Sequence, residues 1–238
     1  MLRRLSPLID LALPPRCPGC SAIVDAPYRF CAGCFGSLDF LGPPWCAACH
    51  APFAIDRGVG VLCDRCAIDP APIGVRAAVA YGAVARTVAL RLKYGGRAAN
   101  AGTMARAMAR LMPDDAAELV PVPLHGWRLW SRGFNQSALI AHALARLTGV
   151  PVRDGVLRRV RSTPPLRGMG PRARLRAVAG AFAIAPARAP LTGHVVLVDD
   201  VHTTGATGQG CAALLRAHGA DRVTVLCWAR VVDRASDD

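Results

Sequence analysis

Eight of the ten cysteines fall in four Cys-x-x-Cys pairs near the beginning of the chain. A Cys-x-x-Cys turn presents two thiolates to one tetrahedral metal ion, and a second turn about 10 to 20 residues later can complete a four-sulfur site. This arrangement occurs twice, so the sequence predicts two zinc ribbons. The predicted ligands are Cys17, Cys20, Cys31, Cys34, Cys46, Cys49, Cys63 and Cys66.

Each predicted site has four thiolates and no open position for water, so the two Zn2+ ions are expected to be structural rather than catalytic. The simplest pairing follows the order of the chain, although the spacing also allows a crossed arrangement. In a segment too short to build its own core, zinc contributes on the order of 10 kcal/mol to folding. The other two cysteines, Cys211 and Cys227, lie in apolar stretches and are expected to be buried.

A second group of polar residues follows the apolar run 195–198. Asp199 and Asp200 come directly after this run, and a turn of small residues opens the next segment. Main-chain N–H groups at a helix start, threonine hydroxyls and a glycine that permits close approach can together surround a phosphate. The residues that predict such a phosphate-binding loop are Thr203, Thr204, Gly205, Ala206 and Thr207.

Two carboxylates beside a phosphate would repel it, so Asp199 and Asp200 require a group between them and the phosphate. Sugar hydroxyls, which donate to carboxylates, or a divalent cation would meet this requirement. Other phosphate loops fit less well, because the chain contains no Gly-Lys dipeptide and its glycines here are not in the dinucleotide-binding order. The pattern therefore predicts a phosphate site that also holds either sugar hydroxyls or a divalent cation.

The segments around this loop alternate between helix and strand patterns, which is typical of a parallel sheet flanked by helices. Residues 84–111 predict two helices separated at Gly95-Gly96, and residues 135–147 predict another. Strands are expected at 119–123, 155–160, 194–198 and 222–232, a helix at 208–218 and a loop at 162–179. We therefore predict a double zinc-ribbon module over residues 1–69 and an α/β domain over residues 70–235.

Basic residues are concentrated in the middle of the chain. Residues 70–198 contain 19 of the 29 lysines and arginines but only four of the 16 acidic residues. Within this range, residues 155–198 contain no acidic residue. Such a charge favours phosphate-bearing partners. The N-terminus imitates a secretory signal, but Pro7 and Asp10 interrupt the apolar run, so we expect a short helix there, no membrane span and a cytoplasmic protein.

The stretch 195–210 resembles the phosphoribosyl pyrophosphate loop of type I phosphoribosyltransferases. This resemblance implies that Asp199 and Asp200 hold the ribose hydroxyls and that residues 203–207 hold the 5′-phosphate. The paired knuckles, Leu92-Lys-Tyr-Gly-Gly-Arg97, Pro121-Val-Pro-Leu-His125, Ser131-Arg-Gly-Phe-Asn-Gln136 and Gly180-Ala-Phe182 resemble the ComF family of competence and DNA-uptake proteins. That second resemblance implies a type I phosphoribosyltransferase-like domain after the zinc module, and a role in handling single-stranded DNA during natural transformation.

Basic and aromatic residues elsewhere are further candidates for contact with pyrophosphate or nucleic acid. Parallel sheets bind ligands at the carboxyl ends of their strands, and the turn after residues 120–124 lies at such an end. Trp127, Trp130 and Phe134 interleave with arginines, as in a stacking platform for unpaired bases, but their spacing favours burial in the core. The basic candidates are Lys93, Arg97, Arg128, Arg132 and Arg167.

Two functions from different classes remain open on the sequence alone. The favoured function is the handling of single-stranded DNA by a protein that retains a phosphoribosyl pyrophosphate-type loop. The alternative is an active phosphoribosyltransferase of nucleotide metabolism, which would need a Mg2+ ion and a loop that closes over the sugar. No nucleobase-binding hood is recognisable. A third and weaker hypothesis is that the zinc ribbons are docking sites for an uptake helicase or a channel protein.

Overall fold

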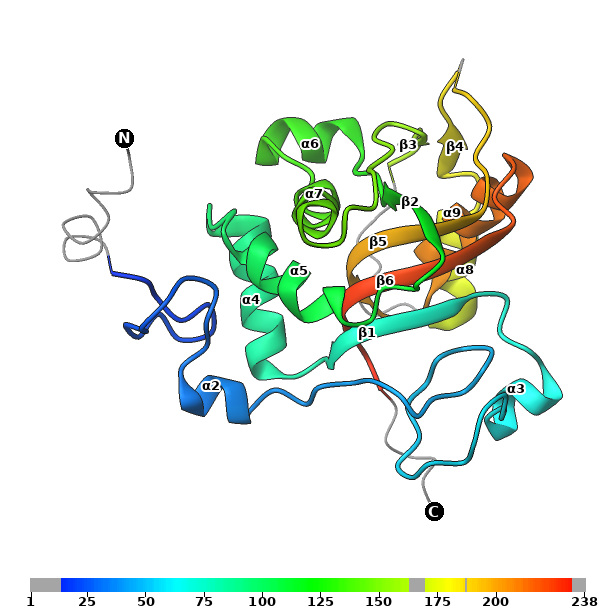
Figure 1. Ribbon diagram of the computed structural model, residues 1–238. Coiled ribbons are helices and arrows are strands. Elements are labelled where there is room, and N and C mark those ends of the chain that lie inside the picture. Colours follow the sequence, from blue (N-terminus) through cyan, green and yellow to red (C-terminus); the bar gives the residue numbers. More distant parts are fainter. Residues whose placement is uncertain (1–13, 163–169, 187, 233–238) are drawn as a thin grey trace.

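The computed structural model describes residues 14–162, 170–186 and 188–232. Its centre is a four-stranded sheet of order β1-β6-β5-β2, in which all neighbouring strands are parallel. The strands are β1 (Gly74–Ala80), β2 (Ala116–Pro121), β5 (His194–His202) and β6 (Arg222–Arg230). The main helices are α4 (Ala83–Tyr94), α5 (Asn100–Ala109), α7 (Gln136–Thr148) and α9 (Ala206–Ala217). Figure 1 shows the sheet between these helices, so the predicted α/β class is confirmed.

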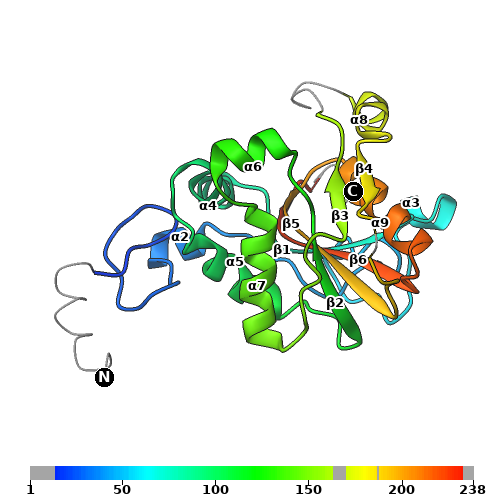
Figure 2. The same ribbon diagram turned by 90° about the horizontal axis from the view of Figure 1, so that it is seen from above.

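The two central strands are buried on both faces, as expected for parallel strands covered by helices. Along β5, Val196 and Val198 pack in one apolar cluster with residues of α4, α5 and α7, whereas Val195 and Leu197 pack in a second cluster with residues of α9. This alternation follows from the two-residue period of a strand. Figure 2 accordingly shows α5 and α7 on one side of the sheet and α9 on the other.

Several elements differ from the sequence predictions. Residues Pro171–Val178 form the helix α8 where a loop was expected, because proline is favourable in a first helical turn and arginine, alanine and leucine are good helix formers. The short helix α6 (Gly126–Arg132) follows β2, and β4 (Phe182–Ile184) pairs antiparallel with β3 (Leu157–Arg159). The helix expected over the first 13 residues lies outside the described residues.

Both edges of the sheet are covered by chain. The two ribbons contain the short helices α2 (Ala32–Gly36) and α3 (Asp64–Ile68). The segment that connects the ribbons runs beside β1 in space. Leu41 N–H donates to the Ala78 carbonyl at 3.0 Å, and Ala80 N–H donates to the Asp39 carbonyl at 2.8 Å. At the other edge, Leu119 N–H donates to the Pro151 carbonyl at 2.8 Å. Covered edges prevent pairing with other chains.

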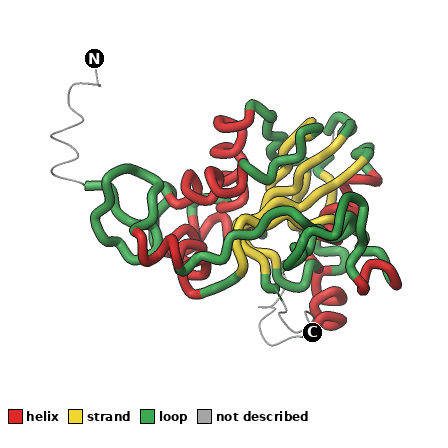
Figure 3. The backbone as a smooth tube through the Cα atoms, turned by 60° about the horizontal axis from the view of Figure 1, so that its bottom comes forward, coloured by secondary structure: helices red, strands yellow, loops and turns green. Residues whose placement is uncertain are grey.

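Figure 3 shows the strands enclosed by helices and by the long loops of the N-terminal segment. The second ribbon packs against β1, where Val75 N–H donates to the Cys49 carbonyl at 3.1 Å, whereas the first ribbon packs against α4, where Arg91 Nη1 donates to the Pro18 carbonyl at 2.8 Å. A domain boundary near residue 70 remains a prediction. Within the described residues, none of the helices is both long enough and apolar enough to cross a membrane.

Candidate functional site

Each half of the cysteine set comes together in chain order, which is the simplest of the predicted pairings. The Sγ atoms of each group lie within 4.8 Å of one another. The Sγ atoms of Cys20 and Cys31 are 3.6 Å apart, and those of Cys49 and Cys63 are 3.8 Å apart. Zn–S bonds of about 2.3 Å in a tetrahedron place two sulfurs about 3.8 Å apart, so both groups fit Zn2+. The groups are Cys17, Cys20, Cys31 and Cys34, and Cys46, Cys49, Cys63 and Cys66.

Main-chain N–H groups stabilise one thiolate in each group. Cys31 N–H donates to Cys17 Sγ at 3.4 Å, and Cys63 N–H donates to Cys46 Sγ at 3.3 Å. Burial opposes ionisation, but backbone N–H groups hold the pKa of Cys17 and of Cys46 down to about 6. Burial and the neighbouring thiols raise the pKa of Cys34 and of Cys49 to about 12. The thiolate form binds metal, so each group supplies one thiolate near neutral pH and releases protons as it binds Zn2+.

The predicted phosphate loop is a strand, a turn and a helix. β5 continues through both aspartates to His202, farther than the predicted strand end at Val198, and α9 begins at Ala206. Gly205 has a φ of +81°, a left-handed conformation that favours glycine, and an added Cβ would lie 3.2 Å from His202 Cε1. The first N–H groups of α9 have no partner within the helix and are therefore available to an anion.

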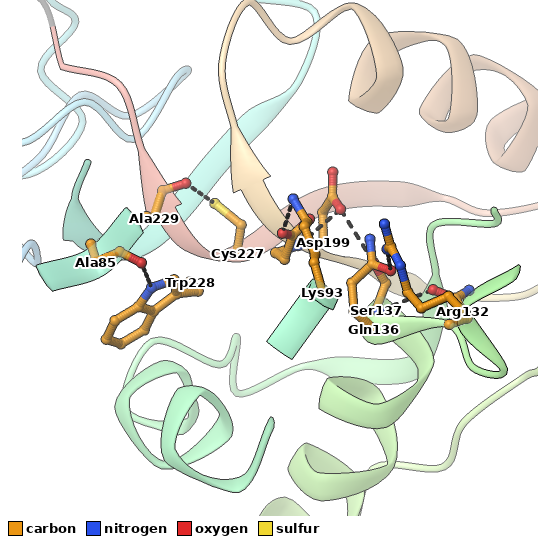
Figure 4. A network of polar contacts seen from close by, with 11 residues as sticks. Ala85, Lys93, Arg132, Gln136, Ser137, Asp199, Cys227, Trp228 and Ala229 are labelled. Carbon is orange, nitrogen blue, oxygen red and sulfur yellow. Dashed lines mark hydrogen bonds and ion pairs between the residues drawn. The ribbon is translucent and has the colours of Figure 1, made fainter. Parts of the chain in front are cut away.

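The two aspartates at this loop are already engaged with neighbouring elements (Figure 4). Asp200 is only 4% exposed, and its carboxylate forms an ion pair with the Lys93 ammonium at the end of α4. The Asp199 carboxylate accepts hydrogen bonds from Ser137 Oγ at 3.2 Å and from Asp200 N–H at 2.8 Å. The sequence predicts that Lys93 contacts a phosphate, whereas in the structure its ammonium group contacts the Asp200 carboxylate.

The electrostatics of this cluster differ between its members. Burial and the nearby Asp200 carboxylate raise the pKa of Asp199 to about 7. Burial alone would lower the pKa of Lys93, but Asp200 raises it above its ordinary value, so Lys93 stays charged. Asp199 can therefore take up or release a proton near neutral pH, while Lys93 stays protonated.

Replacing Lys93 by methionine is expected to lower the free energy of unfolding by about 3 kcal/mol, because the buried Asp200 carboxylate loses its counter-charge. Urea unfolding at neutral pH measures this change. In the Asp200→Asn background the same Lys93→Met substitution should cost less than half as much. Equal costs in both backgrounds would mean that the ion pair does not stabilise the fold.

Residues at the end of β2 complete the surroundings. Asn135 Nδ2 donates to the Val122 carbonyl at 3.0 Å, which fixes the start of α7 to the end of β2. Arg132 Nη1 donates to Gln136 Oε1 at 2.6 Å, and its guanidinium lies 5.0 Å from the Tyr94 ring centroid. Figure 4 shows Arg132 and Gln136 beside Ser137 and Asp199.

Four of these positions were not singled out as site residues. Asn135 and Gln136 lie in the Gly-Phe-Asn-Gln stretch, whose polar residues after a glycine were the available signal. Ser137 is 1% exposed, and nothing in the sequence indicates its contact with Asp199. Arg159 on β3 has a lowered pKa because it is buried and because Arg128 lies near it. The structure thus gathers basic groups from β3 and α6 at this end of the sheet.

One predicted basic contact lies elsewhere, and another is not among the described residues. Arg97 Nη1 donates to Ser21 Oγ of the first zinc ribbon at 3.0 Å, so it is directed away from the aspartates. Arg167 lies outside the described residues.

The favoured burial of both tryptophans is wrong. Trp127 is 66% exposed and Trp130 is 77% exposed, because α6 contributes no buried residue and extends beyond the end of the sheet. Their ring centroids are 5.3 Å apart with planes inclined by 27°. Phe134, in contrast, packs against the core, and Cys211 and Cys227 are buried as predicted.

Comparison with known proteins identifies relatives over most of the chain. A double zinc ribbon domain model matches residues 8–67. The DNA utilization protein YhgH of Salmonella typhimurium is 34% identical over 200 residues, which cover 79% of this chain and 84% of that protein. Competence protein F of Haemophilus influenzae is 35% identical over 113 residues, which cover 47% of this chain and about half (49%) of that protein.

Two phosphoribosyltransferases are among the solved structures that are similar to this chain. The purine phosphoribosyltransferase of Pyrococcus horikoshii has a TM-score of 0.32 at 20% identity, covering 56% of this chain and 72% of that chain. The adenine phosphoribosyltransferase of Thermoanaerobacter pseudethanolicus has a TM-score of 0.36 at 15% identity, covering 56% of this chain and 82% of that chain. At such TM-scores neither structure bears on the ligand of this chain.

Proposed function

Because the chain belongs to the ComF family, together with Competence protein F and the DNA utilization protein YhgH, we propose that it handles single-stranded DNA during DNA uptake. In this proposal the single DNA strand binds near the carboxyl ends of the β-strands, on a surface formed by α6 and the end of α4. We call this the α6 surface, and it consists of Tyr94, Trp127, Arg128, Trp130 and Arg132.

The observation that carries the proposal is the exposed pair of tryptophans. Large aromatic rings are usually buried, and two of them side by side in solvent on a helix without buried residues call for a partner. Successive unpaired bases stack on such rings regardless of sequence, contributing about 1 to 3 kcal/mol per base. Trp127 and Trp130, with ring centroids 5.3 Å apart, support this kind of contact.

Charge on the same surface supports binding of a phosphate backbone. Arg128 and Arg132 lie on α6 between and beside the tryptophans, and Tyr94, 75% exposed, lies under the Arg132 guanidinium. The region from residue 155 to residue 198 adds arginines without any acid. Arginine guanidinium groups pair with phosphates and stack on rings, so they complement exposed tryptophans in a single-strand site.

The test is the binding of oligo-dT to the zinc-loaded chain at several salt concentrations. Contact with roughly four to six phosphates should give a slope of log affinity against log salt of about −3 to −4, since each contact contributes about 0.7 for single strands. An affinity that does not change with salt would reject the basic surface as the binding site.

The loop after β5 is proposed to bind a phosphorylated pentose such as phosphoribosyl pyrophosphate. The N–H groups at the start of α9 suit the phosphate, and Asp199 and Asp200 suit the ribose hydroxyls, as the resemblance implies. Lys93 supports this assignment, because it neutralises one of two adjacent carboxylates that would otherwise repel the phosphate. This ligand would regulate DNA binding or serve as a substrate.

The alternative is an active phosphoribosyltransferase. Departure of pyrophosphate from the sugar would need Mg2+ to neutralise the developing charge, and the basic end of the sheet would face the pyrophosphate. Pyrophosphate release from phosphoribosyl pyrophosphate that requires both Mg2+ and a base, and that Asp200→Asn abolishes, would establish this function. Binding of the sugar phosphate without turnover would reject the phosphoribosyltransferase function and retain only the DNA-handling function.

The affinity for phosphoribosyl pyrophosphate is expected to rise as the pH rises through about 7. Ribose hydroxyls donate to the charged carboxylate, so the bound sugar lowers the raised pKa of Asp199 and releases a proton. Calorimetry in two buffers of different ionisation enthalpy measures that release at pH 6.5. The Asp199→Asn variant should lose the release attributed to this carboxyl, and an unchanged release would assign the proton to the ligand.

The zinc ribbons are proposed as docking sites for an uptake helicase or a channel protein, and the whole role is expected in the cytoplasm. Their residues, 1–69, balance six arginines with six aspartates. A neutral surface is less suited to DNA than the middle of the chain. Capture of a purified uptake helicase by the full zinc-loaded chain, with loss on substitution of exposed ribbon residues such as Ile55 and Val59, would support this docking.

A further inference from the structure

A cavity of about 500 Å3 lies at the amino ends of β1, β5 and β6, at the opposite end of these strands from the phosphate loop. We call it the amino-edge pocket. One wall is the second zinc ribbon, through Ala47, Ala48 and His50. Figure 1 shows how the chain passes from this ribbon through α3 directly into β1. A volume of this size is within the range of small-molecule sites, about 300 to 1,000 Å3.

Two nitrogen atoms in side chains that line this pocket are buried and have no hydrogen-bond partner among the described residues. They are Nδ1 of His50 and Nε of Arg76. Arg76 is held in place by other contacts, because its Nη1 donates to the Leu111 carbonyl at 3.0 Å and its guanidinium lies 4.9 Å from the Trp45 ring centroid. Buried polar groups are satisfied in the great majority of cases, so both side chains keep hydrogen-bonding capacity that the described residues do not fill.

The charges around the pocket favour an anion. Three arginines line it against two aspartates. Asp115 already lies between Arg222, with which it forms an ion pair, and His194 Nδ1, 2.8 Å away. Burial lowers the pKa of Arg76, and the neighbouring Arg222 lowers it further, while Asp114 opposes both effects. Like charges held around one cavity are stabilised when an anion lies between them.

Apolar residues form a smaller part of the lining. It includes alanines of the ribbon, Pro72 and Ile73 before β1, and Val223 at the start of β6. A cavity of about 500 Å3 is larger than a bare inorganic anion fills, so its size favours an organic molecule with an anionic group. One organic anion would therefore contact both the arginines and the apolar part of the lining.

We propose that the amino-edge pocket binds a small organic anion whose carboxylate or phosphate group contacts Arg76 and Arg222. The site is separate from the phosphate loop, and it does not depend on the proposed function. Because the second ribbon forms one wall, the bound anion ties this ribbon to the sheet. Ligand binding to the folded state alone also raises the stability of the protein.

The six histidines allow both ends of the sheet to be observed in one experiment. His50 and His194 line the amino-edge pocket, whereas His202 adjoins Gly205 in the phosphate loop. The zinc-loaded chain, labelled with 13C at histidine, is titrated with inorganic phosphate and separately with acetate at constant pH. Sodium chloride at equal ionic strength is the reference. Saturable shifts of His50 and His194 are expected with at least one of the two anions, and the responsive anion identifies the head group.

The variant Arg222→Gln should weaken the anion affinity reported by His50 by about tenfold or more, as expected for loss of a charge-assisted hydrogen bond. The matched control is Arg146→Gln on the exposed face of α7, which should leave the affinity unchanged. Shifts confined to His202 would overturn the pocket proposal and leave the phosphate loop supported. Shifts equal to those in sodium chloride at all six histidines would overturn the pocket and leave the phosphate loop without anion binding.

Discussion

A Cys46→Ser variant should contain one zinc ion per chain instead of two, and its second ribbon should lose its ordered structure. A four-thiolate site with one ligand replaced loses much of a binding free energy on the order of 10 kcal/mol. The loss extends into the sheet, because the Cys49 carbonyl accepts from Val75 N–H at 3.1 Å and the His50 carbonyl accepts from Arg230 Nη1 at 3.2 Å. Zinc released into a colorimetric chelator under denaturing conditions measures the content, and proteolysis of the native chain measures the disorder.

The control for this experiment is Cys211→Ala, since Cys211 is fully buried in α9 and lies outside both cysteine groups. That variant should keep two zinc ions and resist proteolysis between residues 46 and 73. Cys20→Ser should also leave one zinc ion, but new cleavage should then occur in the first ribbon. Two zinc ions in the Cys46→Ser variant would contradict the assignment of its thiolate as a ligand.

The two cysteine groups and the strand, turn and helix of residues 199–207 were predictable because short spacings encode them. Two cysteines separated by two residues must lie close together in any fold, and residues 199–207 combine a strand end with a helix start. The helices of residues 84–111 were predictable for the same local reason. In contrast, β1 and α6 are short, and their apolar and aromatic residues fit helix and strand patterns equally well.

The contacts of the site depend on the three-dimensional arrangement, which local patterns do not encode. Lys93 meets Asp200, and Ser137 meets Asp199, only because α4, α7 and the end of β5 pack together. The burial of Trp127 and Trp130 was predicted from a helical face, but such a face needs an element to cover it. α6 begins after the end of β2, where the described residues provide no such cover, and the rings remain in solvent.

Replacing Trp127 and Trp130 together by alanine should weaken the binding of oligo-dT by about 2 to 6 kcal/mol, because each stacked base contributes about 1 to 3 kcal/mol. The smaller value corresponds to a loss of about 30-fold in affinity. The free energy of unfolding should change little, since α6 has no buried residue. Fluorescence anisotropy of a labelled oligonucleotide measures the affinity, and urea unfolding measures the stability.

Matched variants separate stacking from charge on the α6 surface. Phe35→Ala removes an aromatic ring that is 56% exposed in the first ribbon and should leave oligo-dT binding unchanged, whereas Trp127→Phe should retain most of it. Loss of the tryptophans removes stacking but no phosphate contact, so the salt slope should persist while the affinity falls. Arg128→Gln should instead reduce the slope by about 0.7. An affinity that survives the double tryptophan variant would move the DNA-binding site away from α6.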